Sequence, residues 1–147
     1  MKIGIKLFGD KETAASLKRM GDKVVPTIRD STKKAVLYVH QEMPPYPPEP
    51  AGSEYVRTGT AGRAITTFGV GSVAGGAQSL SEVKPLFDGA QGIVGGAIDY
   101  LPYLIDEEEQ TDVHLLNGWF TLQDVIRKAR DAITDIYRKA IKELVNG

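Results

Sequence analysis

Apolar and polar residues alternate near the N-terminus in the way that is typical of a β-strand. Over residues 2–8, Ile3, Ile5 and Leu7 fall on one face, and lysine and glycine residues fall between them. In an extended chain, successive side chains point to opposite faces, so a hydrophobic repeat of two residues puts all the apolar side chains on one face. The segment therefore predicts a half-buried strand, and the glycine and aspartate that follow it favour a turn.

Apolar residues then recur at helical spacing from about residue 11 to residue 43. Gly21 and Pro26 interrupt this pattern, which predicts a short helix followed by a longer one over residues 22–43. Pro26 fits the first turn of the longer helix, because an N–H group at that place has no acceptor within the helix.

The most continuous apolar stripe lies in the last 27 residues and predicts a helix over residues 121–145. Thr121, with Asp124 three residues later, resembles a capping box with aspartate in the place of glutamate or glutamine. A helix of this size is about 37 Å long. It is longer than a four-stranded sheet can cover, so we expect part of it to meet another subunit.

The middle of the chain contains short apolar segments separated by glycine. Residues 63–70, 80–87 and 92–98 predict strands, and the glycine-rich residues 69–77 predict a mobile hairpin tip. Together with the flanking helices, this order predicts an α+β fold. We expect a small, mostly antiparallel sheet, made of the N-terminal strand and about three central strands, packed against two long helices.

Composition limits the fold to one domain over residues 1–147 and excludes several kinds of protein. The chain has 147 residues, of which 41% are apolar, which is enough for one modest core. Its 18 basic and 19 acidic residues nearly cancel, so bulk charge does not favour a nucleic acid or a membrane surface. It has no cysteine for disulfides, and its apolar runs fall short of the ~20 residues of a membrane helix. We expect a soluble protein made in the cytoplasm.

The charge is distributed unevenly along the chain. The net charge is +4 over residues 1–43, −7 over residues 44–120 and +2 over residues 121–147. This distribution would let identical subunits meet head to tail with opposite signs in contact. The more ordinary interpretation is neutralisation within one subunit, because folding alone brings segments of opposite charge together.

Three patterns that sometimes carry chemistry are weak here. Gly69-x-Gly71 with Gly75-Gly76 lacks the Gly-Lys-Ser/Thr ending of a phosphate loop, and no serine lies in a Gly-x-Ser-x-Gly elbow. The acidic residues 106–109 are contiguous, and contiguous carboxylates seldom converge on one cation. The sequence predicts no catalytic residue, metal site or cofactor. One alternative interpretation is that the chain is an enzyme that uses the glycine-rich loop or the acidic run.

Residues 44–50 contain five prolines in seven positions. Proline removes backbone donors and fixes φ, so this segment predicts a protruding, proline-rich arm over residues 44–57 that contacts a partner. Such an arm could also be the ligand of an SH3-like protein, which would make the chain a proline-motif adaptor module. Aromatic and charged residues around these segments give the candidate interface, in which Arg57 and Arg63 would pair with acidic groups. It comprises Met43, Tyr46, Tyr55, Arg57, Arg63, Asp106, Glu107 and Trp119.

The order of segments carries a resemblance over nearly the whole chain. The segments are Leu17-Lys18-Arg19, the basic helix up to residue 43, the proline loop, Thr58-Gly59 through Ile65, the tyrosine-rich residues 100–106, and Phe120-Thr121-Leu122. This order resembles the neck and tail-completion proteins of tailed bacteriophages, in the family named after the tenth gene product of phage HK-ninety-seven. Ala61 and Ala64 stand where that family usually has leucine and serine, which leaves a related minor tail or head-closure protein as an alternative.

The resemblance implies a structural virion protein rather than an enzyme. Such a protein joins head and tail or completes the tail, as a homo-oligomeric ring on the axis between capsid and tail. Its partners would be copies of itself and neighbouring neck and tail proteins, with no specific nucleic acid and no membrane. It would be found in the virion, and in the host cytoplasm during assembly.

Overall fold

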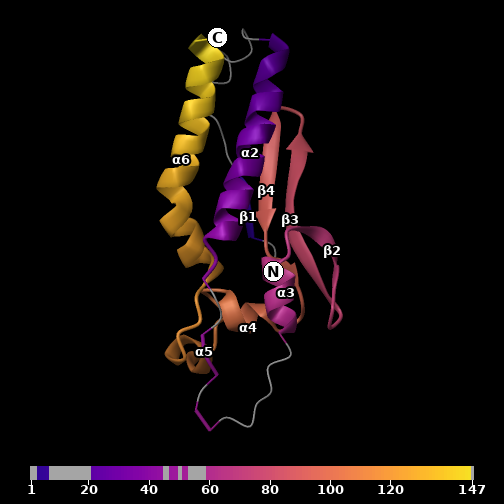
Figure 1. Ribbon diagram of the computed structural model, residues 1–147, viewed down its shortest axis with the longest axis vertical. Helices are drawn as coiled ribbons and strands as arrows, with labels where there is room; N and C mark the ends of the chain where they lie inside the picture. Colours follow the sequence, from indigo (N-terminus) through magenta and orange to yellow (C-terminus); the bar gives the residue numbers. More distant parts are fainter. Residues whose placement is uncertain (1–2, 7–20, 45–46, 50, 53–58, 147) are drawn as a thin grey trace.

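A computed structural model describes residues 3–6, 21–44, 47–49, 51–52 and 59–146 (Figure 1). Two long helices, α2 (Val24–Gln41) and α6 (Leu122–Asn146), run antiparallel and side by side, and α2 also contacts the sheet. The shorter helical elements are η1 (Gly21–Lys23), α3 (Thr60–Thr66), α4 (Leu101–Ile105) and α5 (Asp112–Leu116). The strands are β1 (Ile3–Lys6), β2 (Gly69–Val73), β3 (Ala77–Leu86), β4 (Gly89–Val94) and β5 (Gly96–Ala97).

The sheet is antiparallel and has the strand order β1-β4-β3-β2, with β5 paired to β3. The long strand β3 pairs with three other strands. Its first half pairs with β2 and β5, and its second half pairs with β4. The N-terminal strand joins the edge of β4, where Ile3 is opposite Val94. The predicted α+β class, with a small antiparallel sheet packed against helices, is confirmed.

The long helices also match the sequence pattern. α2 begins at Val24, so Pro26 lies in its first turn as predicted. Before α6, the Asp124 N–H donates to the Thr121 hydroxyl at 3.1 Å, which confirms Thr121 as the capping residue. The predicted short helix before residue 21 falls outside the described residues.

The predicted strand over residues 63–70 is wrong, because α3 occupies residues up to Thr66 and β2 begins only at Gly69. The buried positions Ala61, Ala64 and Ile65 have the spacing of a helix, and all three face the interior. Gly59, with φ at 70°, provides the left-handed residue immediately before the helix.

The glycine-rich segment does form a hairpin, with Val73 opposite Ala77. Its first glycines lie within β2, and the tip consists of residues 74–76. Gly75 has φ at 97°, and a side chain there would collide with Thr60 at the start of α3. The Arg63 Nε donates to the Ala74 carbonyl at 3.2 Å. The tip predicted to be mobile is therefore packed against α3.

The core consists of two clusters that meet near the start of α6. The first cluster joins α2, β4 and α6 through Ala35, Val36, Val39, Val94, Val125, Ala129 and Ile133. The second joins α3, α4 and α6 through Ala61, Ile65, Leu101, Leu104, Ile105 and Leu122. Met43 and Phe120 pack against both clusters and connect them.

Glycines let the helices approach the sheet closely. A Cβ atom on Gly92 would lie 2.5 Å from Val36 Cγ2, and one on Gly96 would lie 2.9 Å from Ala64 Cβ. Both distances are shorter than van der Waals contact allows, so α2 and α3 depend on glycine at these two positions in order to lie flat against the strands.

Candidate interaction site

Two of the acidic residues 106–109, Asp106 and Glu107, are bonded to the start of α6. Asp106 Oδ1 accepts hydrogen bonds from the Glu108 N–H at 3.0 Å and from Gln123 Nε2 at 3.1 Å. Gln123 Oε1 in turn accepts one from the Glu107 N–H at 3.2 Å. The amide of Gln123 thus bonds the loop with both of its ends, which fixes the loop relative to the helix axis.

Arg127, one turn further along α6, completes this attachment. Its guanidinium donates to both carboxylate oxygens of Glu107, at 2.8 and 3.1 Å, and to Asp124 Oδ1 at 2.5 Å. The hydrogen bond from Arg127 is the main reason why the pKa of Asp124 lies below its ordinary value. The two carboxylates also raise the pKa of Arg127, so the cation is held charged.

Gln110 closes the loop on its other side. Its Nε2 donates to the Leu104 carbonyl at 2.6 Å and lies 3.3 and 3.4 Å from the carbonyls of Trp119 and Phe120. The Gln110 N–H also donates to the Asp106 carbonyl at 2.8 Å. One side chain therefore connects the end of α4 to the residues immediately before α6.

The short helix α5 lies between these attachments, and polar contacts hold it. The Thr111 hydroxyl and His114 Nδ1 are 2.6 Å apart, and the Trp119 N–H donates to the His114 carbonyl at 3.1 Å. The rings of His114 and Trp119 meet edge to face with centroids 5.6 Å apart. No residue of α5 is buried.

α5 carries an exposed apolar surface. Val113, Leu115 and Leu116 are 65%, 61% and 84% exposed, and Tyr103 on the neighbouring α4 is also exposed. We call these four residues the α5 patch. Glu108, Glu109 and Asp112 beside it are exposed as well. Contiguous exposed apolar side chains with a charged rim are typical of a protein-binding surface.

The predicted interface residues divide into three groups. Asp106, Glu107 and Trp119 come together beside α5, but the two acids bond to α6 and Trp119 packs against the second core cluster. Met43 is half-buried between the two clusters, and Arg63 bonds to Thr60 and to the hairpin tip.

Tyr46, Tyr55 and Arg57, together with much of the predicted arm, lie outside the described residues.

The three apolar residues of α5 were not among the predicted interface residues. Their signal is the short run Val113-His114-Leu115-Leu116 directly after an acidic segment. Such a run within a loop is unusual, because loops are mostly polar.

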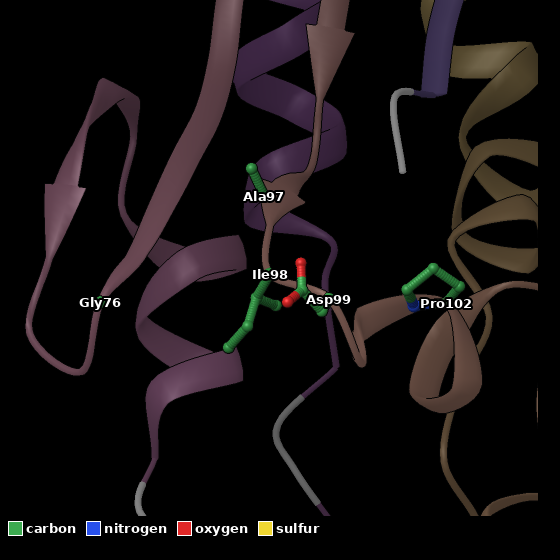
Figure 2. A pocket seen from close by; sticks show the side chains of 5 residues that line it. All are labelled: Gly76, Ala97, Ile98, Asp99 and Pro102. Carbon is green, nitrogen blue, oxygen red and sulfur yellow. The ribbon is translucent and has the colours of Figure 1, made fainter.

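A shallow, open cavity of about 360 Å³ lies between the β2–β3 hairpin tip and the start of α4 (Figure 2). Gly76, Ala97, Ile98, Asp99 and Pro102 line it, and Asp99 is the one ionisable side chain among these five. A single exposed carboxylate offers no second group for acid–base chemistry. Within the described segments, no three histidine or acidic side chains gather in a way that could hold a metal ion.

His40 forms a separate polar position between α2 and α3. Its Nε2 is buried and has no hydrogen-bond partner among the described residues, and its ring meets Phe68 edge to face at 5.5 Å. Burial lowers the pKa of His40, and a backbone hydrogen bond at Thr66 acts in the opposite direction. The ring is therefore a neutral packing element, which fits a structural role.

Comparison with protein-family models, with curated proteins and with solved structures gave no match for this chain. None of the helices in the described part of the chain combines the length and the apolar content that a bilayer crossing requires.

Proposed function

We propose that this chain is a structural protein of a tailed-phage neck or tail, which joins head and tail or completes the tail as a homo-oligomeric ring. The order of its segments and their resemblance to the neck and tail-completion family support this proposal. A related minor tail or head-closure protein would use the same kind of surface.

The observation that carries the proposal is the α5 patch. Four apolar side chains face solvent on α4 and α5, and Gln110, Gln123 and Arg127 hold the segment that joins these two helices. Exposed leucines on a fixed backbone contribute nothing to the core of their own subunit. They are suited to contact with another protein, because a preorganised surface loses little conformational entropy on binding.

In this function the protein acts through contact and not through covalent chemistry. Copies of the chain would bind one another and the neighbouring components of the neck, and burial of apolar area would supply the free energy. The acidic rim around the patch would select a basic partner surface and disfavour an acidic one.

The test is to delete the gene in the phage or prophage that encodes it and to examine the particles by electron microscopy. We expect filled heads and separate tails, and we expect purified protein added to the lysate to restore joined particles. Mass spectrometry of wild-type virions should detect the chain in a small, fixed number of copies. Joined, infectious particles without the protein would contradict the proposal.

A further inference from the structure

The α5 patch has a counterpart toward the opposite end of the molecule. Phe87, in the turn between β3 and β4, is fully exposed, and Leu86 beside it is also exposed. Arg29 of α2 lies next to this turn and donates from Nη2 to the Leu86 carbonyl at 3.4 Å. Lys33 lies one turn further along α2 and is exposed. We call Arg29, Lys33, Leu86 and Phe87 the Phe87 patch.

The two patches differ in charge. The acids exposed beside the α5 patch are Glu108, Glu109 and Asp112, whereas Glu107 is paired with Arg127. Residues 23–34, in contrast, carry four exposed cations, Lys23, Arg29, Lys33 and Lys34, and one exposed acid, Asp30. Asp88 adds one more acid at the β3–β4 turn. The exposed charges beside the α5 patch are therefore acidic, and cations outnumber acids on the part of α2 that ends beside the Phe87 patch.

We propose that the α5 patch of one copy binds the Phe87 patch of a second copy, so that copies of the chain associate head to tail. The inference deepens the proposed function, because it names the two surfaces that would join the subunits of a ring. Each patch offers exposed apolar side chains to the other, and the acidic rim meets the basic one.

Charge also disfavours a contact between two copies of the same patch. A contact between two α5 patches would place Glu108, Glu109 and Asp112 against the same acids of the other copy. A contact between two Phe87 patches would oppose arginine and lysine. Like charges in a desolvated contact are unfavourable, so only the unlike patches fit each other.

The positions of the patches are compatible with a ring. In Figure 1, α5 lies in the lower part of the molecule, below the start of α6, and the β3–β4 turn lies toward the upper end. Each subunit can therefore use both patches at once. Such a heterologous contact continues from copy to copy, and it gives a ring where the rotation between subunits closes.

The test compares variants that remove the apolar groups of one patch without adding charge. Leu115→Gln/Leu116→Gln disables the α5 patch, and Phe87→Gln disables the Phe87 patch. All three side chains are exposed, so we expect each variant to fold and to melt like the wild type. Sedimentation and light scattering over a range of concentrations should show self-association weakened about tenfold or more in each variant.

The decisive sample is a mixture of the two variants. In a head-to-tail assembly, the intact α5 patch of Phe87→Gln binds the intact Phe87 patch of the double variant. The mixture should therefore form a one-to-one dimer and nothing larger. Val70→Gln, which alters an exposed apolar residue outside both patches, serves as the matched control and should associate like the wild type.

Several results would overturn the inference: a wild-type protein that stays monomeric at the highest concentration, a mixture that forms no dimer, or a loss of association in Val70→Gln. A monomeric wild type would also count against a ring of copies, but none of these results bears on whether the gene is required for joined particles, so head–tail joining can stand or fall separately.

Discussion

The contact between α2 and α6 and the segment around α5 use apolar and polar groups in opposite ways. Between the long helices, Val36, Val39 and Ile133 are buried and the charged side chains face outward. Beside α5, hydrogen bonds with Gln110, Gln123 and Arg127 hold the segment before the helix, and the apolar side chains of α5 face outward. The first arrangement stabilises the fold of the subunit, whereas the second presents apolar side chains to a binding partner.

This difference indicates where each region would gain its free energy. Burial of apolar area is the main driving force of folding, and the α2–α6 contact buries its apolar side chains within one chain. α5 buries none of its residues in this subunit. Its leucines can gain comparable free energy only when another molecule covers them, which is the reason for assigning them to assembly.

The largest effect that separates the two regions should come from truncation of one apolar side chain in each. Ile105 is fully buried in the second core cluster, and Leu116 on α5 is almost fully exposed. Ile105→Ala should lower the free energy of unfolding by about 2–5 kcal/mol, because it removes buried methyl groups and leaves a cavity. Leu116→Ala should change it by less than about 0.5 kcal/mol.

Urea unfolding followed by Trp119 fluorescence and by circular dichroism measures both values. The samples must be dilute enough to be monomeric, since association would add its own free energy. A loss above about 1 kcal/mol for monomeric Leu116→Ala would mean that the leucine packs within its own subunit.

The sequence predicted the parts of the fold that have long-range periodicity. α2 and α6 repeat their apolar stripes over many turns, and Thr121 marks a helix start by its own chemistry. α3 was mistaken for a strand because a seven-residue segment holds too few repeats to separate the two periods. α5 has five residues and buries none of them, so it has no periodic signal to find.

The candidate site was predictable only in part. Asp106, Glu107 and Trp119 do lie beside α5, but the sequence could not show that the acids bond inward. That outcome depends on Gln123 and Arg127, which are 17 and 20 residues away from their partners. In the same way, the contact of Arg63 with the hairpin tip follows from how β2 turns back toward α3.

An intermediate effect should follow from removal of the amide that holds the α5 segment. Gln110→Ala removes the donor to the Leu104 carbonyl and to the carbonyls before α6. Loss of a partly buried hydrogen-bond partner costs about 1–3 kcal/mol. We expect most of this loss to be local, with faster amide hydrogen exchange in residues 106–119.

Hydrogen exchange by mass spectrometry can compare that segment with the middle of α2, which serves as the internal control. Gln91→Ala, a change at a half-buried glutamine on β4, is the matched variant and should leave exchange around α5 unchanged. Equal acceleration in α2 and in residues 106–119 of Gln110→Ala would show that the amide supports the whole fold instead of the patch.

The smallest effect should come from Arg127, although it donates three hydrogen bonds to two carboxylates. The guanidinium and both carboxylates are about half exposed, so water screens the pairs. Arg127→Ala should therefore lower the free energy of unfolding only slightly, and less at high salt. Arg138→Ala, which breaks a single pair with Asp135 on the same helix, is the matched control.

The pH dependence of this loss follows from the lowered pKa of Asp124, of which Arg127 is the main cause. A carboxyl group whose pKa is lower in the folded state stabilises the protein above its unfolded pKa of about 4, and that stabilisation disappears as the pH falls through the folded pKa. The difference between wild type and Arg127→Ala should therefore be constant from pH 5 to pH 7 and shrink below about pH 4. A difference that persists at pH 2 would mean that the aliphatic part of the arginine, and not its charge, holds the loop on α6.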